Sequence, residues 1–278
     1  QVITTGAIAG LNSDQVSALD TAQITSLTSL QLASLSQNQF VSIQTTGLAN
    51  FTTQQIQSFG SVQLGYLTSD QMVALSTSQI RALSTNSFNA MTEQQLVALS
   101  SEQLASMTSS QLFVLSTNQL SSIQTADLVK FSSDQIRTLR TAHIAVLSGD
   151  VIAGLDTSQI TALTSVQVMA LSTDQVAALE SADVEVFFTS QIRALSSAQL
   201  AAMATTQVAR FGTSQVQAFV STTLKGLSDT QIIALNSEQI SAFTNTQWQS
   251  LSASQISAIS SDDFSALTVS KLRLLNTT

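Results

Sequence analysis

The chain has 278 residues, of which only 9% are charged and 5% are aromatic, and it contains no Pro and no Cys. Its net charge of −8 repels the phosphates of nucleic acid, so neither DNA nor RNA is expected as a partner. The lack of Cys excludes a disulfide framework, a thiol nucleophile and a Cys-based metal site. No apolar run reaches the roughly 18 residues of a membrane span, because polar residues return throughout. This bias toward Ser, Thr, Gln, Ala and Leu indicates a repeat.

The chain consists of consecutive octads, of which the first is Thr4–Leu11 and the last ends at Leu275. These 34 octads follow one another without an insertion. The fifth place of every octad, a residue whose number is a multiple of eight, is apolar, and so is the eighth place, three residues later. Two unbroken apolar rows predict a continuous core and a single repeat array over residues 1–278.

Each octad is predicted to form one short helix. Its two apolar places are three residues apart, which puts them on one face of a helix but on opposite faces of a strand. Ser or Thr at the first place and Gln at the fourth have the spacing of a capping box, and a hydroxyl at either the first or the second place fits the cap. Acidic residues gather in the first four places and most basic residues in the sixth and seventh, as the helix dipole favours. An unbroken helix would rotate the apolar stripe by about 80° per octad, so the chain must bend in each one.

The predicted fold class is all-α, a solenoid or superhelix of short capped helices with one helix per octad. Helices this short need neighbours that bury their apolar faces. The fourth place shows a slower rhythm, because the residues that replace Gln recur at every fifth octad in two series. The replacements are Ala7, Gly47, Ser87 and Asp127, then His143, Asp183, Thr223 and Asp263, with Val151 and Lys271 outside both series.

This rhythm predicts that about five octads complete one turn of the superhelix, so that octads separated by this interval, such as those of Gly47 and Ser87, stack. The alternative is that five octads are only the length of an ancestral duplication. The step from Asp127 to His143 is two octads instead of five, which predicts a register slip near residues 128–155.

The side chains that most resemble functional groups have structural interpretations. His143 is the only histidine, and because no G-x-S-x-G motif accompanies it, we expect it to fill a variable slot. Asp183 is interpreted as a mark of the repeat register, and Trp248, in the core row, as a buried side chain rather than a ligand-stacking one. Asp262 and Asp263 lack a calcium-loop pattern, which favours solvated residues at a helix N-terminus over a cation site. The sequence therefore assigns no catalytic, cofactor-binding or metal-ligating residue, and no cofactor.

Ser and Thr at the second place form the most extensive row of side chains that we expect to be exposed. Because a solenoid turns the period of its sequence into rows on its surface, these hydroxyls offer a regular array to a polysaccharide, a glycan or ice, or to O-glycosylation. The other interpretation is that they cap helices and keep the protein soluble.

The motif L-[ST]-x-x-Q-[VI]-x-A-L, close to LSTDQVAAL at residues 171–179 and LTSDQMVAL at residues 67–75, resembles the octapeptide-repeat arrays of long bacterial surface and adhesin-like proteins. It also resembles the opening of the repeat in TAL effectors, which are α-solenoids that read DNA. The second helix and the base-reading loop of that repeat are missing from this chain, and its charge is acidic, so the resemblance does not extend to DNA binding.

These features predict a non-enzymatic structural protein, extracellular or at the cell surface, that forms the rod or filament of a fibre, an adhesin stalk or a surface layer. The alternative is a ligand-binding module that uses the Ser and Thr rows. The chain begins with QVI and ends with NTT, and neither end carries a polar capping repeat. We therefore expect either a segment of a longer surface protein or a subunit that associates with itself head to tail.

Overall fold

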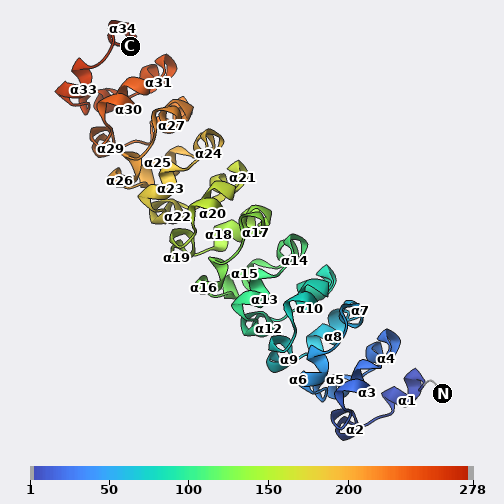
Figure 1. Cartoon of the computed structure of the whole chain (residues 1–278). Helices are drawn as coiled ribbons and strands as arrows, with labels where there is room; N and C mark the ends of the chain where they lie inside the picture. The colour runs from blue at the N-terminus through green and yellow to red at the C-terminus, as the bar shows by residue number, and fades with distance from the viewer. Residues whose placement is uncertain (1–2, 275–278) are drawn as a thin grey trace. The chain divides into compact units, whose positions relative to one another are not determined.

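The computed structural model describes residues 3–274, in which one short α-helix corresponds to each octad (Figure 1). The predicted all-α repeat architecture is therefore confirmed. The chain divides into two compact units, and the division falls between Leu139 and Arg140. Over residues 3–274, no helix combines the length and the apolar character that crossing a bilayer requires.

The first unit contains α1 (Thr5–Ala9), α2 (Ser13–Ser17), α3 (Thr21–Thr25), α4 (Ser29–Ala33), α5 (Gln37–Val41), α6 (Thr45–Ala49), α7 (Thr53–Gln57), α8 (Ser61–Tyr66), α9 (Ser69–Val73), α10 (Thr77–Ala82), α11 (Thr85–Asn89), α12 (Glu93–Ala98), α13 (Ser101–Ala105), α14 (Ser109–Val114), α15 (Thr117–Ser122), α16 (Thr125–Leu128) and α17 (Ser133–Thr138).

The second unit contains α18 (Thr141–Val146), α19 (Gly149–Ala153), α20 (Thr157–Ala162), α21 (Ser165–Ala170), α22 (Thr173–Ala178), α23 (Ser181–Glu185), α24 (Thr189–Ala194), α25 (Ser197–Ala202), α26 (Thr205–Val208), α27 (Thr213–Ala218), α28 (Ser221–Leu224), α29 (Asp229–Ile233), α30 (Ser237–Ala242), α31 (Asn245–Ser250), α32 (Ala253–Ser257), α33 (Ser261–Ser265) and α34 (Val269–Leu274).

In octads such as that of α22, the bend lies at the eighth place and at the first place of the next octad, where the backbone is extended. After α22, Leu179 has φ −58° and ψ 140°, Glu180 has φ −72° and ψ 153°, and α23 then begins. The first-place residue is the N-cap, as the pair Ser172 and Gln175 shows: the Ser172 hydroxyl accepts a hydrogen bond of 3.1 Å from the Gln175 backbone N–H. The cap is therefore the first of the two hydroxyls, and the second-place residue already belongs to the helix.

The fifth-place and eighth-place rows form the core of both units, as predicted. In α22 and its corner, Val176 is 0% exposed and Leu179 is 4% exposed. A few members of the two rows are half-buried, namely Leu11, Leu19, Ile256, Phe264 and Leu272. Leu275, predicted to complete the eighth-place row, lies outside the described residues, as do the terminal residues 1–2 and 276–278.

Within each unit, a helix packs against the helices three before and three after it. In the first unit α7 packs against α4 and α10, and in the second α24 packs against α21 and α27. Figure 1 shows α1, α4, α7 and α10 following one edge of the first unit. Side chains at the fourth place reach carbonyl oxygens 28 to 31 residues earlier, so one turn takes between three and four octads.

The predicted turn of five octads is wrong. Helices α6 and α11, which carry Gly47 and Ser87, are five octads apart. Helix α6 packs against α3 and α9, and α11 packs against α8 and α14, so octads at an interval of five are not stacked neighbours. At corners such as Leu179 and Glu180, two consecutive extended residues turn the chain between one short helix and the next, and the fourth-place hydrogen bonds connect octads that are three to four apart. The single array over residues 1–278 and the register slip near residues 128–155 stay predictions.

Candidate functional site

The most regular polar feature of the structure is a set of buried fourth-place glutamines. In α10, Gln79 is 2% exposed, and its side-chain Oε1 accepts a hydrogen bond of 2.7 Å from the Ser76 backbone N–H. The Gln79 N–H in turn donates to the Ser76 hydroxyl at 3.3 Å, which completes the capping box. The other half of the amide leaves the helix: Nε2 donates to the carbonyl oxygens of Leu48, at 3.0 Å, and Phe51, at 2.8 Å.

These two carbonyls lie 31 and 28 residues before Gln79, in the preceding turn. The same donation to a carbonyl of the preceding turn recurs along both units, and the side chains that make it are called the glutamine row. The glutamine row comprises Gln31, Gln39, Gln55, Gln63, Gln71, Gln79, Gln95, Gln103, Gln111, Gln119, Gln135, Gln175, Gln191, Gln199, Gln207, Gln215, Gln231, Gln239, Gln247 and Gln255.

Each member of the row supplies hydrogen bonds that the short helices cannot make for themselves. A helix leaves N–H groups without partners at its start and carbonyls without partners at its end. A buried backbone group without a partner costs about 1–3 kcal/mol. One amide satisfies an N–H at its own helix start and carbonyls at the end of an earlier helix. The capping glutamine therefore also forms a hydrogen bond to the preceding turn, and this bond is called the inter-turn tie.

Two of the residues that replace Gln keep this tie with a shorter side chain. The Ser87 hydroxyl donates to the Phe59 carbonyl at 2.7 Å, and the Thr223 hydroxyl donates to the Leu195 carbonyl at 3.2 Å, each 28 residues earlier. In the octad of Thr223, the backbone lies close to the preceding turn. Gly226 of this octad shows it, since a Cβ added there would lie 2.1 Å from the backbone oxygen of Ser197.

Gly47 makes no side-chain tie, because it has no side chain. A Cβ added there would lie 2.7 Å from Ile24 Cγ2, so the core of the preceding turn fills the space. A tie at the surface is made instead by Gln44, the N-cap residue of α6, whose Nε2 donates to the Ser17 hydroxyl at 2.9 Å.

The acidic replacements divide into two kinds. Asp127 and Asp263 accept hydrogen bonds from the preceding turn, through the hydroxyls of Ser101 and, at 2.5 Å, of Ser237. Asp263 is therefore not simply a solvated residue at a helix start. Asp183 is 4% exposed, and its Oδ2 accepts a hydrogen bond of 2.9 Å from the backbone N–H of its own N-cap residue. Burial raises the pKa of the Asp183 carboxyl.

The basic replacements are His143 and Lys271. The His143 imidazole is fully buried, with Nδ1 3.4 Å from the Arg140 backbone N and Nε2 2.6 Å from Arg140 Nη2. Lys271 reproduces the glutamine tie, because its Nζ donates to the carbonyls of Ser241, at 2.7 Å, and Phe243. Burial lowers the pKa of the Lys271 ammonium group.

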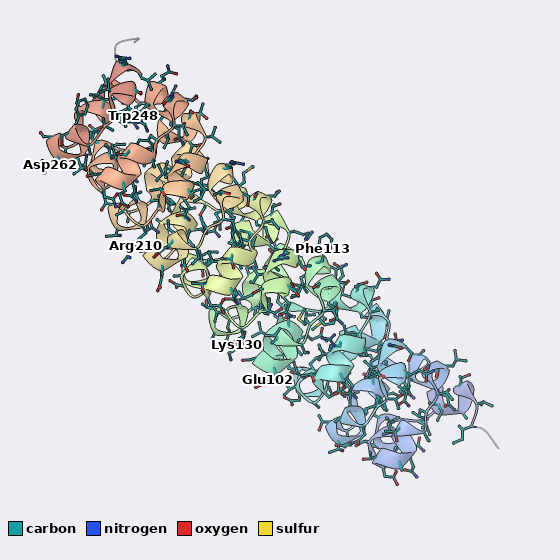
Figure 2. All side chains as sticks on the ribbon, turned by 45° about the horizontal axis from the view of Figure 1, so that its top comes forward. Glu102, Phe113, Lys130, Arg210, Trp248 and Asp262 are labelled. Atoms are coloured by element: carbon teal, nitrogen blue, oxygen red, sulfur yellow. The ribbon has the colours of Figure 1, made fainter. Side chains whose placement is uncertain are left out.

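Trp248 lies in the core, as its place in the row predicts, and is 1% exposed. Its ring packs edge-on against Phe243, with centroids 6.1 Å apart, and Lys271 Nζ lies 5.8 Å from the ring centroid. Trp248 Nε1 has no hydrogen-bond partner, and within residues 3–274 it is the one buried side-chain nitrogen or oxygen of which this is true. Figure 2 shows Trp248 within the ribbon of the second unit and Asp262 at its outer edge.

Sequence comparison matches six stretches of the chain to the family described as the ALTTAQ repeat: residues 1–29, 40–77, 72–101, 120–157, 176–213 and 208–245. Together they cover more than half of the chain. The chain belongs to the ALTTAQ repeat family. The six letters of that description correspond here to ALSTSQ, residues 74–79, in which Leu75 is the buried eighth-place residue, Ser76 the N-cap and Gln79 the tie. The ALTTAQ motif thus contains one corner, one cap and one inter-turn bond. No curated protein matches the chain.

Proposed function

We propose that this ALTTAQ repeat chain is a non-enzymatic structural protein, extracellular or at the cell surface, whose function is to supply length and to associate with itself. The observation that carries the proposal is the glutamine row. Its hydrogen bonds join each turn to the preceding one in the same way along each unit, so turns can be added without a change in those already present. The resemblance to octapeptide-repeat arrays of long bacterial surface proteins supports a location outside the cell.

In the described part of the chain, the side-chain amides of the glutamine row all donate in one direction, toward the N-terminal side, and this supports association between copies of the chain. Gln215 donates from α27 to the carbonyls of Val184 and Phe187, and Gln247 donates from α31 to those of Val216 and Phe219. Through the glutamine row, a turn therefore has amide donors on one face and carbonyl acceptors on the other. Such faces join head to tail, the arrangement that produces open filaments.

Electron microscopy and light scattering over a range of protein concentrations test the proposal. We expect elongated particles whose mass and length rise with concentration. Compact particles that remain monomeric at high concentration would contradict both extension and self-association. Antibody labelling of intact cells of the source organism tests the location, because an extracellular array is labelled without permeabilisation.

The second candidate function, ligand binding by surface hydroxyls, is favoured by one hollow in the first unit. This hollow has a volume of about 420 Å³, and its lining includes Ser13, Asp14, Thr45, Thr68 and Asp70. Hydroxyls and carboxylates of this kind hydrogen-bond to the hydroxyl groups of a sugar.

Glycan-array binding tests this second function, with the double variant Asp14→Ala and Asp70→Ala as the matched comparison. Binding that the double variant loses would support it. Binding that the variant retains, or no binding by the natural chain, would count against it.

A further inference from the structure

We propose that Asp183 is a proton-dependent tie between two turns of the second unit. As a carboxylic acid it donates a hydrogen bond to a backbone carbonyl of the preceding turn, as Gln does in other octads. As a carboxylate it cannot donate, and the tie is lost.

The neighbouring octads show what the fourth place does in this part of the molecule. Gln175 donates to the carbonyls of Ile144 and Leu147, both at 2.7 Å, and Gln191 donates to those of Ile160 and Leu163, both at 2.9 Å. Asp183 occupies the intermediate position on α23, which packs against α20 and α26.

The same spacings of 28 and 31 residues lead from Asp183 to the carbonyls of Leu155 and Ile152. Leu155 is 5% exposed, and in residues 3–274 no side chain donates a hydrogen bond to its carbonyl. A carbonyl that receives an amide donor in the adjacent turns therefore lacks one here.

The chemistry of the carboxyl group explains why its proton matters. An ionised carboxylate only accepts hydrogen bonds, and next to a carbonyl oxygen it is repelled, whereas a protonated one carries an O–H donor. Asp183 already accepts from the Glu180 N–H through Oδ2. Burial is the main reason that the Asp183 pKa is raised, and the Glu180 charge adds to it, while the bond from the Glu180 N–H opposes both.

The other charged groups near α23 form hydrogen bonds or ion pairs with residues other than Asp183. Helices α20 and α26 contain no charged residue. Asp156, the N-cap of α20, accepts hydrogen bonds from the Ser158 hydroxyl and the Gln159 N–H, which lower its pKa. Glu185, on α23 itself, lies 3.9 Å from Arg210, and both side chains are 61% exposed. These arrangements provide no cation against the Asp183 carboxylate.

The other two aspartates of the series are matched by hydroxyl donors. Asp127 and Asp263 each accept from a serine 26 residues earlier, whereas the residue 26 before Asp183 is the exposed Thr157, and these two residues share no hydrogen bond in the described part of the chain. Asp183 is thus the aspartate of the series that needs a proton to bond to the preceding turn.

A raised pKa in the folded state means that folding binds the proton. The stabilisation is complete below the ordinary Asp pKa of about 3.9 and is lost as the pH rises through the folded value. The second unit should therefore become less stable from acid to neutral pH because of this one group.

Melting temperatures of the whole chain and of Asp183→Gln, measured between about pH 4 and about pH 8, test the proposal. Gln supplies a donor at every pH, so we expect the variant to melt about 2–4 °C higher at neutral pH and this difference to shrink at acid pH. A difference that stays constant over the range would overturn the proposal. If Asp183→Gln does not fold, Asp183→Asn, which removes the charge, must show the same trend.

The reverse substitution, Gln175→Asp, is the matched control. It places a carboxyl group where Leu147 already accepts from an amide, and it should create a new loss of stability between acid and neutral pH. Carboxyl NMR titration of Asp183 gives a readout that does not depend on melting. An Asp183 carboxyl that titrates at or below the ordinary Asp pKa would also overturn the proposal.

Discussion

Two consecutive octads of the second unit make the same inter-turn tie with side chains of different length. In α27, Gln215 reaches the Val184 and Phe187 carbonyls at 2.9 and 2.8 Å. In α28, the shorter Thr223 reaches the Leu195 carbonyl at 3.2 Å, and a glycine in its octad allows the backbone of the preceding turn to approach. At Thr223, a short side chain thus replaces Gln where the backbones of the two turns lie close together.

The largest effect is expected from Gly226→Ala, which removes the close approach. The new Cβ would lie 2.1 Å from the Ser197 backbone oxygen, and because backbone cannot move aside as a side chain does, we expect a loss of about 3 kcal/mol or more in the free energy of unfolding. Urea denaturation measures it. The control is Gly65→Ala, whose Cβ meets nothing within 4 Å and which should be neutral or stabilising. Equal effects of both variants would mean that the two turns are not in close contact.

Gln215→Met tests the other side of the comparison. Methionine fills a similar volume but donates no hydrogen bond, so the Val184 and Phe187 carbonyls lose their donor, and we expect a loss of about 2–3 kcal/mol. The control is Gln23→Met, because Gln23 is exposed and its side chain bonds, among the described residues, only to its own N-cap residue Asp20. Thermal melting of both variants measures the difference, and a Gln23 variant as unstable as the Gln215 variant would show that the cap matters and the tie does not.

Thr223→Val removes the hydroxyl and keeps the shape of the side chain. Only one hydrogen bond of 3.2 Å is lost, so the expected destabilisation is about 1 kcal/mol. Chemical denaturation of this variant and of Thr205→Val, at an exposed second place, compares a buried hydroxyl with a solvated one. No difference between them would show that the Thr223 bond adds nothing to stability.

The smallest effect is a gain, expected from Ala204→Ser. Ala204 is the N-cap of α26 and has no side-chain oxygen to accept the bond that the hydroxyl of Ser196 accepts in α25. A serine there should add about 0.5–1 kcal/mol to the free energy of unfolding. Thermal melting checks it, and a decrease in stability would mean that the corner before α26 does not accommodate a hydroxyl.

Much of the local structure could be predicted from the sequence because it depends on residues close in the chain. The spacing of Ser172 and Gln175 indicated a capping box, which is confirmed. The spacing of Val176 and Leu179 indicated that both side chains face the core, and both are buried, although Leu179 lies in the extended corner after α22. The second bond of the fourth-place Gln was missed, because nothing in the octad shows which carbonyl lies above or below it. A signal was present in the near constancy of Gln where Glu would serve the capping box equally well, since Glu has no donor for a carbonyl.

The size of the turn could not be predicted from the five-octad rhythm. That rhythm records which residue stands at one place, whereas the turn is set by backbone angles at corners such as Leu179 and Glu180. His143 and Lys271 make the same point: both differ in chemistry from Gln, yet His143 is fully buried in the same slot and Lys271 donates to the carbonyls of the preceding turn. Because a fourth-place side chain contacts two turns, the sequence of a single octad does not show what surrounds it.

The backward reach of the glutamine row also bears on how the chain acquires its structure during synthesis. Every amide of the row donates to a carbonyl 28 to 31 residues closer to the N-terminus, as Gln79 does to Phe51 and Leu48. A ribosome therefore releases each acceptor before its donor, and a new turn can close as soon as a few tens of residues have emerged. Contacts this local favour rapid folding. We expect the array to form progressively from its N-terminal side, with little unpaired chain exposed at any moment to aggregation.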